Sequence, residues 1–221
     1  VDVAYPFVMY AMDRLTNGEV SEPELIEVMR MVESFVVRRT VCGVPTNRLR
    51  RIFALMSSQV NFGDFVASSR AYLLDNQWPG DNEFRDALVR YRLYVRGRLD
   101  RTRLVLTTLE RSFGHKETPE MGDNITIEHI MPQTLTTEWK EMLGANALEV
   151  HSQWLDTVGN LTLSGYNPDL GNRPFLEKKP LLAKSNFALS KDLQTCEVWN
   201  EETIQDRARA LTERAVTIWK R

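Results

Sequence analysis

The chain has 221 residues, of which 43% are hydrophobic and 26% are charged. This is an ordinary globular composition, with enough apolar side chains for one large core or two smaller ones. The 28 basic and 30 acidic side chains give a net charge of −2, which excludes a uniformly basic nucleic-acid coat and an acidic disordered tail. No run of about 18 apolar residues is present, so we expect no transmembrane helix and a soluble, cytoplasmic protein.

The first half of the chain shows the helical spacing of apolar residues. Ser21 and Glu24 form the pattern of a capping box, and Pro23 lies in the first turn of the helix that this pattern starts. Further apolar stripes predict helices over residues 49–56, 64–73, 82–95 and 105–113. We therefore expect an all-helical subdomain over residues 1–118.

The charge is concentrated at the end of this half. Six arginines and one aspartate lie between Arg90 and Arg103, so this segment carries +5 and the rest of the chain −7. The arginines either pair with acids on neighbouring helices or form a basic groove for the DNA backbone. Arg92, Arg96 and Arg103 are the candidate DNA contacts, and they share one helix face unless Gly97 breaks the helix.

The pattern changes in the second half. A loop rich in Gly, Pro and charged residues covers residues 115–123. Residues 125–130 and 159–163 have the β-branched and aliphatic character of short strands. Helices are expected around residues 139–143, at the end of 167–184, and over 200–219. The order strand, long loop, strand, helix defines a second expected domain over residues 119–221.

One of the three histidines, His129, lies beside Glu128 at the end of the first predicted strand. A neutral imidazole accepts a proton from water at physiological pH, and a carboxylate binds a hard divalent cation. Amide oxygens and phosphate-binding cations follow downstream, at Asn160, Asn167, Asn172, Arg173, Lys178 and Lys179. Together these groups fit the hydrolysis of a phosphodiester.

A structural interpretation of the same residues is also open. A single His-Glu pair is common and most often structural. Asn160 after a glycine is typical of a turn, and Lys178-Lys179 is typical of a solvated helix face. Their order on a strand–loop–strand–helix frame favours the chemical interpretation.

Three motifs together resemble a known family. Glu128-His-Ile-Met-Pro-Gln, Gly159-Asn-Leu-Thr-Leu and Asn172-Arg-Pro-Phe-Leu-Glu-Lys-Lys are similar to the His-Xaa-Xaa-Pro nuclease domain of GmrSD-type restriction endonucleases. That domain belongs to the HNH, or His-Me finger, superfamily. The resemblance implies a mainly α fold, with an N-terminal helical bundle before a small ββα-metal core and its flanking helices. It extends from the Phe35 region through Trp78 to Trp219.

The resemblance also implies roles for single residues. His129 matches the general base, Glu128 the ligand of Mg²⁺, Mn²⁺ or another divalent ion, and Asn160 the residue that orients the catalytic loop. The second metal ligand is either Asn167 or Asn172, and we favour Asn172 because basic residues follow it.

The cations after Asn172 match the phosphate-binding helix of the family. Lys178 or Lys179 would hold the phosphate, and Arg173 would join them in binding DNA. The paired Cys-Xaa-Xaa-Cys motifs of zinc-stabilised relatives are absent from the sequence, so we expect no structural zinc.

The resulting hypothesis is a metal-dependent endonuclease or nickase that cuts double-stranded DNA in a modification-dependent or phage-defence restriction system. The family pairs this domain with an N-terminal ParB-like, nucleotide-hydrolysing sensor domain. The sequence contains no comparable nucleotide-binding loop, so it resembles the effector half, with the sensor in the same chain or a partner chain. The alternative is a non-catalytic DNA-binding or partner-docking module with a degenerate nuclease core.

Overall fold

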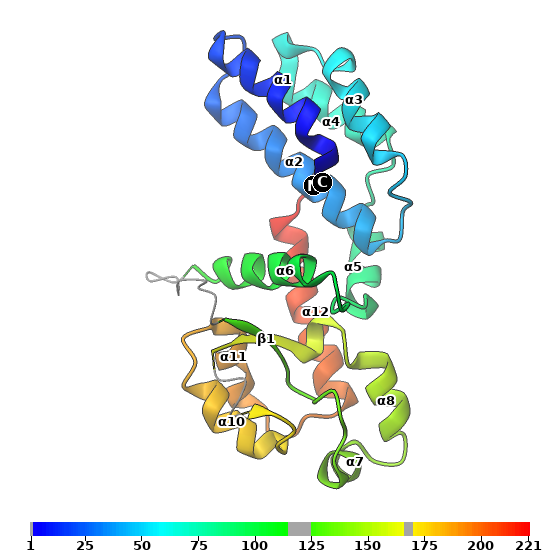
Figure 1. Ribbon diagram of the computed structural model, residues 1–221, viewed down its shortest axis with the longest axis vertical. Helices are drawn as coiled ribbons and strands as arrows, with labels where there is room; N and C mark the ends of the chain where they lie inside the picture. Colours follow the sequence, from blue (N-terminus) through cyan, green and yellow to red (C-terminus); the bar gives the residue numbers. More distant parts are fainter. Residues whose placement is uncertain (1, 115–124, 166–169) are drawn as a thin grey trace. The chain divides into compact units, whose positions relative to one another are not determined.

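A computed structural model describes residues 2–114, 125–165 and 170–221 (Figure 1). The chain forms two compact units, one of Val1–Ala87 with Trp219–Arg221 and the other of Leu88–Ile218. Each unit has a hydrophobic core of its own. The mainly helical fold class expected from the sequence is confirmed.

The first unit is a helical bundle in which α1 packs on α3 and α2 packs on α4. Its core contains Phe7, Val28, Phe35 and Phe53, all fully buried. The predicted capping box is present, with the Ser21 backbone N–H donating to Glu24 at 2.9 Å. The helices of this unit are η1 (Asp2–Ala4), α1 (Tyr5–Thr16), α2 (Glu22–Val41), α3 (Leu49–Gln59), η2 (Phe62–Asp64) and α4 (Phe65–Asp75).

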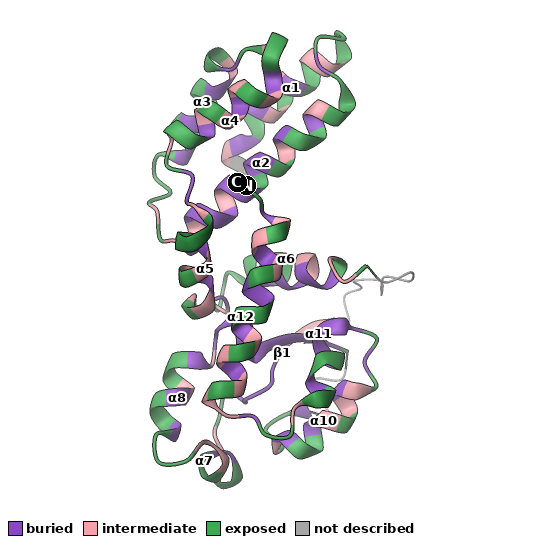
Figure 2. Ribbon diagram, turned by 180° about the vertical axis from the view of Figure 1, so that it is seen from behind, coloured by how far each residue is buried: buried purple, intermediate pink, exposed green. Residues whose placement is uncertain are grey.

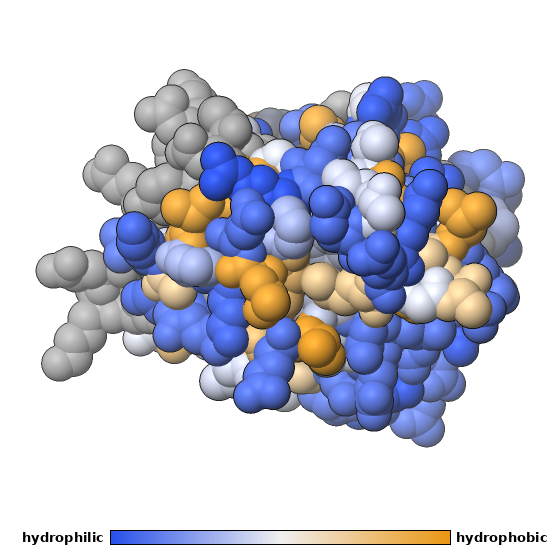
Figure 3. Space-filling model, turned by 90° about the horizontal axis from the view of Figure 1, so that it is seen from below, coloured by the Kyte–Doolittle hydropathy of each residue, from blue (hydrophilic) through white to orange (hydrophobic). Residues whose placement is uncertain are grey.

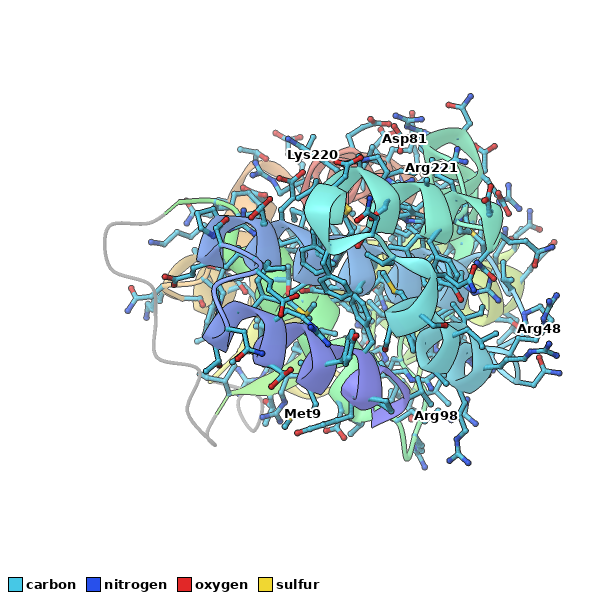
Figure 4. The ribbon with its side chains drawn as sticks, turned by 90° about the horizontal axis from the view of Figure 1, so that it is seen from above. Met9, Arg48, Asp81, Arg98, Lys220 and Arg221 are labelled. Carbon is cyan, nitrogen blue, oxygen red and sulfur yellow. The ribbon has the colours of Figure 1, made fainter. Side chains whose placement is uncertain are left out.

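Two buried arginines of α2 organise the end of this bundle. Arg39 donates to the carbonyl oxygens of Asn76 at 2.6 Å and Pro45 at 3.0 Å. Arg38 pairs with Asp81 at 2.6 Å, and Asp81 lines the same surface pocket as Arg221. Figure 4 looks onto this unit and labels both residues. Arg39 therefore satisfies carbonyl oxygens in the segments after α2 and α4, and Arg38 is compensated by a carboxylate.

The arginine-rich segment follows α5 (Asp81–Arg90), which carries the chain from the first unit into the second. The helix expected as far as residue 95 ends at Arg90, and residues 91–98 are not helical. The backbone N–H groups of Leu93 and Tyr94 instead donate to the carbonyl oxygen of Asp156, at 2.8 and 3.1 Å. Gly97 has φ +81°, a left-handed conformation that favours glycine.

The non-helical conformation of residues 91–98 changes the expected placement of the arginines. Arg92 and Arg96 lie in the non-helical segment, whereas Arg103 lies in α6 (Leu99–Arg111). The three arginines therefore do not share one helix face, and the alternative of an interrupted helix holds; the interruption begins at Arg90, before Gly97, because hydrogen bonds to Asp156 replace helical ones.

The second unit is built around a two-stranded antiparallel sheet of β1 (Thr126–His129) and β2 (Leu161–Ser164). Glu128 lies opposite Thr162 in the register, and His129 opposite Leu161. The remaining elements of this unit are α7 (Thr137–Leu143), α8 (Ala147–Trp154), η3 (Val158–Asn160), α10 (Phe175–Ala183), α11 (Ala188–Lys191), η4 (Asp192–Thr195) and α12 (Glu201–Ile218).

Helices cover the small sheet. Both α6 and α11 pack against β2, and α12 packs against η3 and α6 (Figure 1). Packing thus groups α6 with the second unit and divides the chain after residue 87. The division at residue 118 expected from the sequence stays a prediction.

The core of the second unit is rich in aromatic side chains. Phe175 and Trp199 stack with ring centroids 5.3 Å apart, and Trp139 and Trp154 are buried beside them in the same cluster. The predicted stripe of α12 is confirmed, since its inner face is buried and its outer face exposed (Figure 2).

The face seen in Figure 3 is largely hydrophilic, with apolar residues among the hydrophilic ones. In the part of the chain that the structure describes, no helix is both long enough and apolar enough to cross a membrane.

The short turn η3 is held tightly against α12. Arg207 of α12 donates to the carbonyl oxygens of Gly159 at 2.7 Å and Leu161 at 2.9 Å, and burial lowers the pKa of Arg207 to about 10. A Cβ atom on Gly159 would lie 2.3 Å from the backbone oxygen of Ile204. Only glycine therefore fits at this position.

We predict that Gly159→Ala lowers the free energy of unfolding by about 2 kcal/mol or more, because η3 and α12 have to separate. Gly165→Ala is the matched control, since its added Cβ would meet its nearest neighbour at 3.8 Å, and we expect a change within about 0.5 kcal/mol. Denaturant unfolding measures both variants. Equal stability of the two would contradict the packing of η3 on α12.

Candidate active site

The candidate site lies where β1 ends, and its two central residues point to different partners. Successive side chains of a strand project to opposite faces. Accordingly, Glu128 contacts Lys178 of α10, whereas His129 contacts Asp156 in the turn before η3. The sequence correctly predicted the strand end and the following helix, and it did not predict the partner of His129.

Glu128 and Lys178 form a buried ion pair. The Lys178 Nζ atom lies 2.7 Å from Glu128 Oε1 and donates to the His129 carbonyl oxygen at 2.9 Å. Burial raises the pKa of Glu128 and lowers the pKa of Lys178, and the charge of each partner opposes the effect on the other. Lys178 lies one turn after the fully buried Phe175, so the core packing of α10 directs the lysine side chain inward.

The His129 ring contacts protein groups on several sides. Its Nε2 atom lies 3.1 Å from Asp156 Oδ1, and its Nδ1 atom lies 3.4 Å from the Gln133 amide nitrogen. The Tyr94 ring meets it edge-on at 4.5 Å between centroids. Burial lowers the pKa of His129, and the hydrogen bond to Asp156 opposes this effect. The lowered pKa favours the neutral imidazole, which is the form that accepts a proton.

Asp156 is the central residue that sequence reasoning missed. Its Oδ2 atom accepts from Arg92 Nε at 2.8 Å. No motif marks Asp156, which is separated from His129 by 27 positions in the chain. The antiparallel pairing of β1 with β2 brings the two together. A surface pocket of about 490 Å³ opens here, lined by Arg92, Tyr94, Val95, Arg96, Gln133, Leu155 and Asp156.

Asn160 fixes the loop that follows β1. Its side-chain oxygen accepts from the backbone N–H of Met131 at 2.7 Å and from the Trp199 indole at 3.0 Å. Its amide nitrogen donates to the carbonyl oxygens of Met131 and Leu155, both at 2.9 Å. The fully buried Asn160 side chain thus uses its whole hydrogen-bonding capacity on neighbouring segments. This arrangement is consistent with the predicted role of orienting the catalytic loop.

The other residues predicted for the site differ in their burial and in whether the structure describes them. Asn172 and Arg173 are exposed in the turn before α10, and Lys179 is half-buried. Asn167 lies outside the described residues. The buried Nζ of Lys178 contacts Glu128 and the His129 backbone, so its contact with a phosphate stays a prediction.

The basic segment contributes directly to the pocket. Arg92 is 78% exposed although it pairs with Asp156, and Arg96 donates to Gln133 at 3.2 Å. Arg103 is exposed on α6. Both interpretations, pairing with acids and a basic groove for DNA, are therefore still open. Arg92 pairs with an acid, yet most of its side chain faces solvent.

The carboxylate oxygens of Glu128 are of the kind that a hard cation prefers. Within residues 2–114, 125–165 and 170–221, no three His, Cys, Asp or Glu side chains gather as a metal-binding group. Glu128 Oε2 has no hydrogen-bond partner among these residues, while Oε1 is held by Lys178. A single carboxylate oxygen is a suitable ligand for Mg²⁺, which usually retains several waters and binds substrate phosphate. Glu128 would hold such an ion, with Asn172 as the second candidate ligand.

The sequence matches the family described as GmrSD restriction endonucleases, C-terminal domain, over residues 78–214. The match covers more than half of the chain, and the chain belongs to this family. This confirms the resemblance seen in the three motifs, and it assigns a restriction-endonuclease type of domain. The match begins at Trp78, so the Phe35 region lies outside it. No curated protein matches the sequence.

We predict that Asn160→Ala lowers the free energy of unfolding by at least about 3 kcal/mol, because several buried groups lose their partners. The matched control is Asn172→Ala at an exposed position, where we expect about 0.5 kcal/mol or less. Thermal and denaturant unfolding measure both. A small effect at Asn160 would show that the loop after β1 is held by other contacts.

Proposed function

We propose that this chain is a metal-dependent DNA endonuclease of the HNH type, with His129 as the general base. The observation that carries the proposal is the buried His129 at the end of β1, which follows Glu128 in the chain and precedes the Met131 segment held by Asn160. The antiparallel strand pair and the following α10 fit the order of a ββα-metal core. Membership of a restriction-endonuclease family supports DNA as the substrate.

In the proposed reaction, His129 accepts a proton from a water molecule next to the scissile phosphate. The water oxygen attacks phosphorus, and the bond between phosphorus and the 3′ oxygen breaks. The leaving oxygen takes a proton from solvent, which yields a 5′-phosphate and a 3′-hydroxyl. A divalent ion at Glu128 would offset the charge that develops on the phosphate and on the leaving oxygen.

The groups around the pocket would position double-stranded DNA. Exposed cations bind phosphates without reading the base sequence, and we assign this role to Arg92, Arg96, Arg103, Arg173 and Lys179. The overall charge of −2 does not oppose this, because only a local cationic path is needed. A ParB-like sensor domain, in the same or a partner chain, would supply recognition of modified or phage DNA in the cytoplasm.

A second candidate function is a non-catalytic DNA-binding or partner-docking module. One observation favours it, since Lys178 holds Glu128 and both ring nitrogens of His129 have protein partners. A catalytic site has to release at least one of these contacts when substrate binds. The two candidates therefore differ in what the removal of His129 does to cleavage and to binding.

We predict that the wild-type chain nicks or cuts plasmid DNA with Mg²⁺ or Mn²⁺, and that His129→Ala reduces the cleavage rate at least about 100-fold. DNA binding, measured by fluorescence anisotropy, should be retained in this variant. His151→Gln is the matched control, because His151 lies in α8 with its Nε2 atom 2.9 Å from the Pro132 carbonyl oxygen, and this variant should keep most of its activity.

Binding without cleavage in both the wild type and His129→Ala would support the non-catalytic module. Cleavage that survives in His129→Ala would reject His129 as the general base. If cleavage requires a divalent ion, a chelator should abolish it and added Mg²⁺ should restore it.

A further inference from the structure

We propose that Asp156 is a positioning residue that holds His129 in the tautomer with hydrogen on Nε2, which leaves Nδ1 to accept the proton of the attacking water. The tautomer follows from the structure alone. Its catalytic consequence rests on the proposed nuclease function. The family motifs do not include Asp156, and its role arises from contacts between segments that are distant in the sequence.

The carboxylate of Asp156 is itself fixed. The residue is 8% exposed, and its two oxygens are divided between Nε2 of His129 and Nε of Arg92. Its backbone oxygen accepts from Leu93 and Tyr94. These contacts hold the Asp156 backbone and side chain in place against the segment that carries Arg92.

The chemistry of the contact determines where the hydrogen lies. An ionised carboxylate is only an acceptor, so the His129 nitrogen 3.1 Å from Asp156 Oδ1 has to be the donor. A neutral imidazole carries one N–H group, and its other nitrogen has a free lone pair. With hydrogen on Nε2, the proton acceptor is Nδ1.

The ring has little freedom to turn over. A half-turn would place a carbon atom opposite Asp156 and break a buried hydrogen bond. The Tyr94 ring packs edge-on against the imidazole with an interplanar angle of 73°. The His129 backbone is paired with Leu161 in the sheet. Orientation and tautomer are therefore set together.

The two ring nitrogens differ in how easily their partners can leave. Nε2 faces the buried Asp156, whereas Nδ1 faces the exposed amide of Gln133 at 3.4 Å. Gln133 in turn accepts from the exposed Arg96. These side chains line the pocket, and turning Gln133 away breaks only its part-buried contact with Nδ1 and its exposed contact with Arg96. A water molecule can thus replace Gln133 at Nδ1.

The O–H bond of water breaks and an N–H bond forms at Nδ1, while the oxygen's electron pair forms the bond to phosphorus. The imidazolium that results is stabilised by the carboxylate of Asp156. Arg92 keeps its contact with the other carboxylate oxygen throughout, so the Asp156 side chain stays oriented.

Nitrogen-15 NMR of the whole chain tests the tautomer directly. At about pH 8, where an ordinary imidazole is neutral, we expect His129 of the wild type to show a protonated Nε2 and an unprotonated Nδ1. His129→Ala identifies its signals. Asp156→Asn, whose amide can both donate and accept, should shift both nitrogens toward averaged values. The control Asp206→Asn, at an exposed position on α12, should leave them unchanged.

Plasmid cleavage tests the consequence. Asp156→Asn should lower kcat at least about 10-fold and change KM for DNA less than about twofold, whereas a purely structural role would alter folding and both constants together. A wild-type His129 with hydrogen on Nδ1, or a tautomer unchanged in a folded Asp156→Asn variant, would overturn the proposal. If Asp156→Asn does not fold, the wild-type spectrum by itself still shows which nitrogen of His129 carries the hydrogen.

Failure of the nuclease proposal is distinguishable from failure of this one. An inert wild type with the Nε2–H tautomer dependent on Asp156 rejects the enzyme and keeps the positioning contact. An active wild type whose tautomer does not depend on Asp156 rejects the positioning contact and keeps the enzyme.

Discussion

The buried side chain of Asn160 is the constraint on which the second unit depends. Two strands of four residues each are too short to hold a site by themselves. Asn160 connects the segment after β1, the end of α8 and the region before α12 through Met131, Leu155 and Trp199. Each of these contacts is removed from water, so losing one leaves a costly unpaired group. The position of His129 follows from this connection.

The Glu128 carboxylate has one cation beside it, the Lys178 ammonium, and the proposed divalent ion would be a second. Lys178 compensates Glu128 in the buried pair, which offsets the cost of removing both charges from water. A divalent ion at the same carboxylate would bring a second positive charge close to Lys178. The incoming phosphate would supply negative charge to balance both. In the proposed reaction, metal and DNA are therefore expected to bind with mutual dependence at Glu128.

The sequence predicted those parts of the site that local patterns encode. The strand end at His129, the short helix at Trp139 and the stripe of α12 all follow from spacing that neighbouring residues set. Three motifs also identified the family. The roles of Glu128, His129 and Asn160 stay predictions, although the contacts of Asn160 agree with its assigned role.

The missed features depend on contacts between distant segments. Asp156 reaches His129 only because the sheet and η3 fold back, and no spacing rule encodes that approach. The helix expected through residue 95 stops at Arg90 because Leu93 and Tyr94 bond to Asp156 instead of to their own turn. Lys178 has the pattern of a solvated helix face, yet it is buried because Phe175 turns that face of α10 into the core.

The most direct test of this account is a crystal structure of the His129→Ala variant with duplex DNA and Mn²⁺. We predict an anomalous peak between the Glu128 carboxylate and a DNA phosphate, with the phosphate facing the space left by the imidazole. Manganese bound elsewhere, or DNA bound on a surface away from Glu128, would contradict the assignment of this site as the nuclease centre.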